Sequence, residues 1–171
     1  MAKAYIPAES VDAIRRWIDA LSGMHLGFLV RPWVKNVARS LRKEPKWFLR
    51  DWAAIENPGQ KAETFVGCHL LKAVDGWNDL GLGTFQLHYL RDKEQREVDF
   101  LVIRDGKPWF LAEVKLHDES ISRALGYHQN QVKAPFAFQV VMDAPHVDAD
   151  CFASPRGPLV VPAKTFLSQL L

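Results

Sequence analysis

The stretch REVDFLVIRDGKPWFLAEVKLHD, residues 96–118, contains two apolar runs that are typical of buried strands and that also carry charges. Asp99, Glu113 and Lys115 stand where the middle of a sheet would otherwise hold hydrophobic side chains. Burying an unpaired charge is expensive, so charges in neighbouring strands must pair with each other or share an ion. The placement of these three residues therefore decides what the fold can do.

Side chains alternate between the two faces of a regular strand. This alternation predicts that Asp99 shares its side with Leu101 and Ile103, and that Glu113 shares its side with Lys115. Whether the two acids meet then depends on the turn between the strands.

The turn contains Asp-Gly at 105–106, the commonest sequence signal for a two-residue hairpin loop. With that loop alone, Asp99 and Glu113 would project from opposite faces of the sheet. A three-residue loop at 104–106, or an equivalent β-bulge, would place Asp99 opposite Leu111 and diagonal to Glu113. We expect the longer loop or the bulge, because either would bring the two carboxylates together.

Two carboxylates a few ångströms apart repel each other unless they are protonated or bridged by a cation. Mg²⁺ accepts one or two protein carboxylates and leaves coordination positions for water and phosphate oxygens. We therefore expect Mg²⁺, or Mn²⁺ in its place, at Asp99 and Glu113. The backbone carbonyl of Val114 would complete the ligand set, and Lys115 would position the attacking water.

A third acid, Glu63, lies in a helix predicted over residues 60–75, on the same stripe as Val66, Leu70 and Val74. This stripe is the apolar side of the helix, so it predicts that the Glu63 carboxylate points toward the sheet. The alternative is a first-turn glutamate whose carboxylate stays in water and interacts with the helix dipole.

The remaining segments predict an α/β fold. Further helices are predicted over residues 11–24, 122–132 and 163–171, and strands over residues 25–30, 46–52, 84–91, 96–104, 107–116, 136–143 and 158–162. The central order is helix, three strands, helix, strand. Antiparallel strands followed by a helical crossover indicate a mixed β-sheet sandwiched by helices.

Composition narrows the class of protein. The chain has 171 residues and a formal net charge of +2, which suits one well-buried domain with a small appendage. Cys68 and Cys151 lie far apart without metal-ligand spacing, so neither a disulfide framework nor a zinc site is indicated. No apolar run approaches the ~18 to 20 residues of a membrane span, and the N-terminus lacks a signal-peptide core. We expect a cytoplasmic protein without membrane contact.

The basic residues are concentrated near the N-terminus. Residues 1–50 hold ten Lys and Arg against four acids, whereas residues 51–171 hold twelve against sixteen. Aromatic and basic residues interleave over residues 31–50, a pattern that can serve phosphate backbones. The candidate nucleic-acid-binding residues there are Arg39, Arg42, Lys43 and Lys46. The alternatives are a solvated face and a contact with an acidic neighbouring domain.

Glu63 on a helix, Asp99 on a strand and Glu113-Val114-Lys115 on the next strand resemble the motif of the PD-(D/E)XK nuclease superfamily, whose shared core is αβββαβ. A longer resemblance joins SLRKEPKWFLRDW, KAETFVGCHLLKAV, HYLRDKEQREVDFLV and FLAEVKLHD to the C-terminal domain of a large family of uncharacterised prokaryotic AAA+ ATPases. This resemblance runs from about residue 9 nearly to the C-terminus.

The resemblance implies a restriction-endonuclease-like core over residues 51–171, preceded over residues 1–50 by an N-terminal helix and basic linker that are a winged-helix remnant. It assigns catalysis to Glu63, Asp99, Glu113 and Lys115, and it adds Glu63 to the metal ligands Asp99, Glu113 and Val114 that are expected above. A Gln or Tyr of the following helix would lie near the phosphate; the candidates are Tyr127, Gln129 and Gln131. Val98 stands at the superfamily's named proline, and the sequence contains no GxxxxGK[ST] phosphate loop.

Two hypotheses follow from these patterns. The first is a divalent-metal-dependent nuclease-like domain that hydrolyses phosphodiester bonds, with DNA as the expected partner. The second is a non-catalytic module that keeps the nuclease fold and binds nucleic acid or docks onto an ATPase partner. The retained acids favour the first hypothesis, and the missing ATPase module favours the second.

Overall fold

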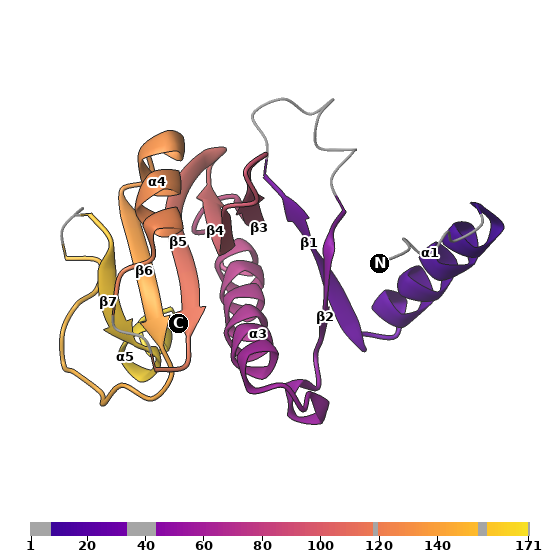
Figure 1. Ribbon diagram of the computed structural model, residues 1–171, viewed down its shortest axis with the longest axis horizontal. Coiled ribbons are helices and arrows are strands. Elements are labelled where there is room, and N and C mark those ends of the chain that lie inside the picture. Colours follow the sequence, from indigo (N-terminus) through magenta and orange to yellow (C-terminus); the bar gives the residue numbers. More distant parts are fainter. Residues whose placement is uncertain (1–7, 34–43, 118–119, 154–156, 171) are drawn as a thin grey trace.

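The computed structural model describes residues 8–33, 44–117, 120–153 and 157–170 (Figure 1). Within these ranges, seven strands form one sheet in the order β2-β1-β3-β4-β5-β6-β7. The strands are β1 (Gly27–Pro32), β2 (Lys46–Leu49), β3 (Phe85–Arg91), β4 (Glu97–Arg104), β5 (Lys107–Lys115), β6 (Phe136–Val141) and β7 (Leu159–Pro162). The helices are α1 (Ala8–Gly23), α3 (Pro58–Asp79), α4 (Arg123–Val132) and α5 (Ala163–Leu167), with a 3₁₀ turn η1 (Trp52–Ala54).

The sheet is mixed, as the sequence predicts. β1 runs parallel to β3, and β5, β6 and β7 run parallel to one another, whereas the pairs β1–β2, β3–β4 and β4–β5 are antiparallel. The order α3, β3, β4, β5, α4, β6 is the predicted helix, three strands, helix, strand. The predicted mixed α/β architecture is therefore confirmed.

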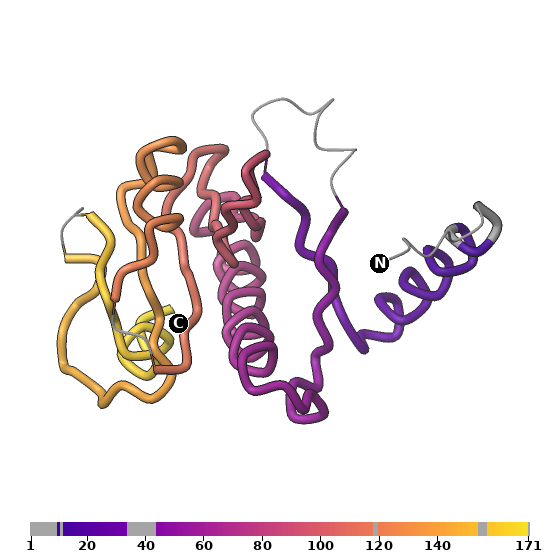
Figure 2. Tube along the Cα trace, in the orientation of Figure 1, coloured from indigo at the N-terminus to yellow at the C-terminus, as the bar shows by residue number. Residues whose placement is uncertain are grey.

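Apolar side chains of the central strands alternate between two buried clusters. One cluster packs against α3 and α5 and includes Phe100, Val102, Phe110, Ala112, Phe138 and Phe166. The other packs against α4 and includes Leu101, Ile103, Leu111, Leu125 and Ala137. Because neighbouring residues of one strand belong to different clusters, the sheet is covered on both faces. Figure 2 follows the chain from α3 through the central strands to α4 and the C-terminal segment.

Helix α3 begins with Pro58, and the side chain of Asn57 caps it by accepting a hydrogen bond from the backbone N–H of Gln60 at 3.0 Å. Two ends are open for this helix in the sequence, Gly76 or the glycines at 81 and 83, and the helix runs through Gly76 to Asp79, so it ends before Gly81. Trp77 explains why the helix continues past Gly76, because burying its side chain in the core stabilises the additional turn.

Helix α1 confirms the N-terminal helix predicted from the sequence and lies beyond the β1–β2 end of the sheet (Figure 1). Trp17 on this helix is 68% exposed. The domain boundary predicted at residue 50 lies just after β2. Strand β1 precedes this boundary and pairs with β3, which follows it, so the sheet continues across the boundary. In the described part of the chain, every helix is too short or too polar to cross a membrane.

The β4–β5 hairpin has a two-residue turn, so the predicted three-residue loop is wrong. Arg104 pairs with Lys107, and the φ angles of +50° at Asp105 and +75° at Gly106 are those of a type I′ turn. The β-bulge that we expected as the alternative to this loop is confirmed, and it lies after the pair Ile103↔Pro108. The partners change from Ile103↔Pro108 to Val102↔Phe110, which leaves one extra residue on β5.

This bulge also corrects the predicted register. Leu111 pairs with Leu101, not with Asp99, and the ladder continues to Phe100↔Ala112. The extra residue sits in β5 instead of in the turn, so the offset between the strands differs from that of a longer loop. The ladder ends at the pair Phe100↔Ala112, and beyond it Asp99 contacts β5 by accepting a hydrogen bond from the backbone N–H of Val114.

A second irregularity changes the direction of Asp99. The β3–β4 partners change from His88↔Leu101 to Leu90↔Val98, so Asp99 and Phe100 together oppose Tyr89. The prediction that Asp99 shares the side of Leu101 is wrong for this reason, because a bulge breaks the alternation.

Candidate functional site

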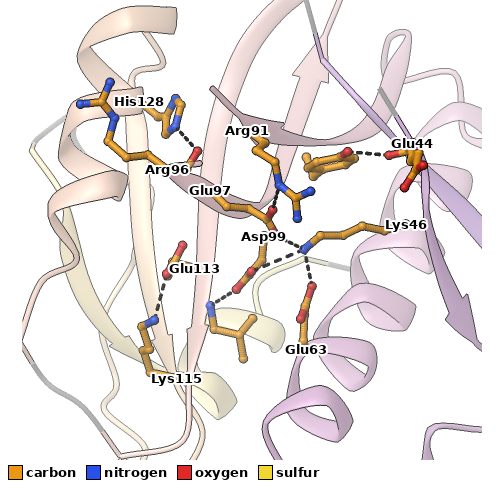
Figure 3. A network of polar contacts seen from close by, with 12 residues as sticks. Glu44, Lys46, Glu63, Arg91, Arg96, Glu97, Asp99, Glu113, Lys115 and His128 are labelled. Atoms are coloured by element: carbon orange, nitrogen blue, oxygen red, sulfur yellow. Dashed lines mark hydrogen bonds and ion pairs between the residues drawn. The ribbon is translucent and has the colours of Figure 1, made fainter. Parts of the chain in front are cut away.

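Lys46 lies at the centre of a cluster of acidic side chains (Figure 3). Its Nζ is 2.8 Å from Glu63 Oε1, 2.5 Å from Glu97 Oε1 and 3.8 Å from Asp99 Oδ1. The side chains of these four residues are no more than 25% exposed. The acids therefore face a positive charge in a poorly hydrated place, where the attraction is stronger than in water.

Strand geometry explains why Lys46 reaches the acids. Phe48, two residues along β2, is buried in the cluster that packs against α3, so Lys46 projects toward the same face. Glu63 in the first turns of α3 meets it there, which agrees with the predicted inward direction of this carboxylate. Burial alone would lower the pKa of Lys46, but its pairing with Glu63, Glu97 and Asp99 outweighs burial and raises it.

Glu97 and Arg91 belong to the cluster and were not among the predicted site residues. The Nε of Arg91 pairs with Glu97 Oε2, while Lys46 binds the other oxygen. Burial alone would raise the pKa of Glu97, but these two cations lower it. The sequence does contain a signal for Glu97: it stands two residues before Asp99, and residues at this spacing in a strand project from the same face.

Asp99 is held by the main chain of the neighbouring strand. The backbone N–H of Val114 donates to Asp99 Oδ2 at 2.9 Å. Burial, followed by the charges of Glu63 and Glu113, raises the pKa of Asp99 to about 7, even though Val114 and Lys46 act in the opposite direction. The site therefore favours a proton or a cation at this carboxylate.

Glu113 has a buried oxygen available for a ligand. Its side chain is 9% exposed, and Oε1 pairs with Lys115 Nζ at 2.9 Å. Oε2 is buried without a hydrogen-bond partner among the described residues. A buried carboxylate oxygen without a partner is costly, so this oxygen is the strongest single indication of a cation site.

A family model described as "Domain of unknown function (DUF4143)" matches residues 58–147, more than half of the chain. The chain belongs to the DUF4143 family. The matched part contains Glu63, Asp99, Glu113 and Lys115, whereas Lys46 precedes it. No curated protein and no solved structure matches the chain significantly.

Of the acidic residues in this DUF4143 protein, Asp99 and Glu113 fit a divalent cation better than Glu63 does. Asp99 offers a carboxylate with a raised pKa, and Glu113 offers an oxygen without a hydrogen-bond partner in the described part of the chain. Glu63 is engaged by Lys46, and Asp99 accepts a hydrogen bond from the backbone N–H of Val114. Among the described residues, no three His, Cys, Asp or Glu side chains stand together as a metal-binding group.

The predicted residues on α4 lie outside the acidic cluster. Gln131 is exposed on α4, Tyr127 carries the Arg96 guanidinium 3.7 Å above its ring, and the buried Gln129 donates to the Ala134 carbonyl at 3.3 Å. Arg39, Arg42 and Lys43 lie outside the described residues. The nucleic-acid-binding roles of these residues and of Lys46 stay predictions.

Proposed function

We propose that this DUF4143 protein is a divalent-metal-dependent nuclease that hydrolyses phosphodiester bonds in DNA. The observation that carries the proposal is Glu113, whose Oε2 is buried without a hydrogen-bond partner among the described residues and whose charge helps to raise the pKa of Asp99 on the neighbouring strand. Two oxygen ligands with excess negative charge suit Mg²⁺ or Mn²⁺, which bind carboxylates and retain positions for phosphate oxygens.

The order of elements supports the same proposal. The αβββαβ succession carries Glu63, Asp99 and Glu113-Val114-Lys115 on α3, β4 and β5, the elements on which the PD-(D/E)XK motif resides. We therefore propose a restriction-endonuclease-like fold, and an evolutionary relationship to the C-terminal domains of AAA+ ATPases, as its structural context.

Each residue has a distinct task in the proposed reaction. Asp99 and Glu113 would hold the cation, with the Val114 carbonyl as a further ligand, and the Val114 N–H fixes the orientation of Asp99. The bound ion would polarise the phosphate and lower the pKa of a water molecule. Lys115 neutralises charge that develops on the phosphate and orients the water. Glu63 assists from α3 by adding negative charge that favours the cation.

The test is cleavage of supercoiled and linear DNA by purified protein in Mg²⁺ or Mn²⁺. We expect cleavage by the wild type, none in EDTA, and a loss of at least about 100-fold in Asp99→Asn, because the substitution removes a charged metal ligand. Lys107→Gln is the matched control, since this exposed residue lies at the other end of β5 from Lys115.

Either of two results would contradict the proposal. Equal cleavage by the wild type and Asp99→Asn would point to a contaminating nuclease. Absence of cleavage by a wild type that binds Mn²⁺ at Asp99 would favour the non-catalytic alternative.

A further inference from the structure

The ammonium of Lys46 occupies the position among the acids that a cation would otherwise fill. It lies within 4 Å of Glu63, Glu97 and Asp99, and two of these, Glu63 and Asp99, are predicted metal ligands. A divalent ion bound by Asp99 would stand close to this ammonium and would be repelled by it. A separate observation concerns Glu113, whose charge acts on Asp99 from the neighbouring strand and whose buried Oε2 has no hydrogen-bond partner among the described residues.

We infer that Lys46 is an internal competitor of the divalent cation: its ammonium holds Glu63 and Asp99 in place, and the ion binds as the ammonium withdraws from them. The inference rests on the proposed function, because it concerns the same metal site. It makes Lys46 a positioning residue that sets how much divalent cation the site requires.

The structure gives the ammonium a place to which it can withdraw. Glu97 binds Lys46 through Oε1 and Arg91 through Oε2, so it remains neutralised and can keep Lys46 after Glu63 and Asp99 turn to the ion. The ring of Tyr89, with its centroid 5.4 Å from Nζ, offers a second favourable contact for the cation. Lys46 is the first residue of β2, a strand at the edge of the sheet, and its four-carbon chain is flexible.

Calorimetric titration with Mn²⁺ tests the competition. We expect Lys46→Gln to bind Mn²⁺ at least about tenfold more tightly than the wild type, because the repelling charge is gone. Lys46→Arg keeps the charge and is expected to stay within about threefold of the wild type. Lys107→Gln loses the same charge far from the acids and is expected to bind like the wild type.

Nuclear magnetic resonance of lysine ammonium groups tests the same exchange in the wild-type protein. The Lys46 ammonium signal, assigned by its absence from the charge-conserving variant Lys46→Arg, should shift or broaden on addition of Mg²⁺. A signal that is unchanged at saturating Mg²⁺ would overturn the inference.

The outcomes separate this inference from the proposed function. Equal or weaker Mn²⁺ binding by Lys46→Gln overturns the inference without contradicting the proposed nuclease site at Asp99 and Glu113. Absence of Mn²⁺ binding in both proteins overturns the two together. Tighter binding by Lys46→Gln without any DNA cleavage supports the competition and contradicts the nuclease.

Discussion

The backbone N–H of Val114 donates a hydrogen bond to Asp99 Oδ2 at 2.9 Å, so the main chain of β5 fixes a carboxylate of β4. The contact exists because a bulge places Asp99 and Phe100 together opposite Tyr89. It leaves Oδ1 directed toward Lys46, 3.8 Å away. One carboxylate thus links the strand backbone to the acidic cluster, and its protonation should be measurable in the stability of the protein.

Asp99→Asn should make the protein more stable above pH 7 in EDTA. The folded state raises the pKa of Asp99 from 3.8 to about 7, so its favourable contribution is complete below about pH 4 and is lost as the pH rises through 7. Asparagine cannot ionise and still offers an oxygen to Val114. The expected gain in the free energy of unfolding at pH 8 is on the order of 4 kcal/mol, falling toward zero near pH 4.

Urea unfolding at several pH values between 4 and 8 checks this expectation. Asp75→Asn, an exposed acid on α3, serves as the control and should follow the pH dependence of the wild type. An Asp99→Asn variant with the same pH dependence as the wild type would show that Asp99 ionises normally in the folded protein.

Binding of Mn²⁺ should strengthen as the pH rises from 6 to 8. With a pKa of about 7, Asp99 is mostly protonated at pH 6 and mostly ionised at pH 8, and the cation must replace its proton. The affinity should therefore increase roughly tenfold over this range, with proton release near pH 6. Calorimetry in two buffers of different ionisation enthalpy measures both quantities, and a pH-independent affinity without proton release would refute the expectation.

The strands could be predicted from the sequence because their signals are local. The Asp-Gly signal is also local and indicates a two-residue turn, whose positive φ angles Asp105 and Gly106 adopt; the longer loop that we expected in order to bring the acids together was wrong, and the alternative bulge lies within β5. The apolar stripe of Val66, Leu70 and Val74 likewise defines the buried side of α3 and places Glu63 toward the sheet.

The directions of the site residues could not be predicted in the same way. Residues 100–103 are all apolar because both faces of β4 are buried, so alternation gives no sign of the bulge at Asp99. Lys46 meets Glu63 only through tertiary packing, 17 residues apart, and its basic surroundings favoured a phosphate-binding role instead. Such contacts depend on how β2 packs against α3, and this packing cannot be inferred from a short stretch of sequence.

Gly67→Ala should destabilise the packing of α3 on β4. A Cβ at Gly67 would lie 2.9 Å from Phe100 Cζ, and Phe100 is fully buried. The overpacking should lower the free energy of unfolding by about 1–3 kcal/mol. Gly126→Ala on α4 is the control: its Cβ would lie 3.6 Å from Pro158 Cγ, an ordinary contact, so the change should be neutral or should stabilise by up to about 1 kcal/mol. Equal stability of Gly67→Ala and the wild type in urea unfolding would mean that α3 can move away from Phe100.

Lys115→Met should separate metal binding from catalysis. Lys115 pairs with Glu113 Oε1 at 2.9 Å and is proposed to act on the water and the phosphate, not on the metal. Its loss should reduce DNA cleavage by about 100-fold or more, because a positioned positive charge no longer offsets the charge that develops in the transition state. Mn²⁺ binding measured by calorimetry should persist, since removing the ammonium frees a carboxylate oxygen. Lys107→Met, on the same strand, should retain both properties; undiminished cleavage by Lys115→Met would exclude Lys115 from the reaction.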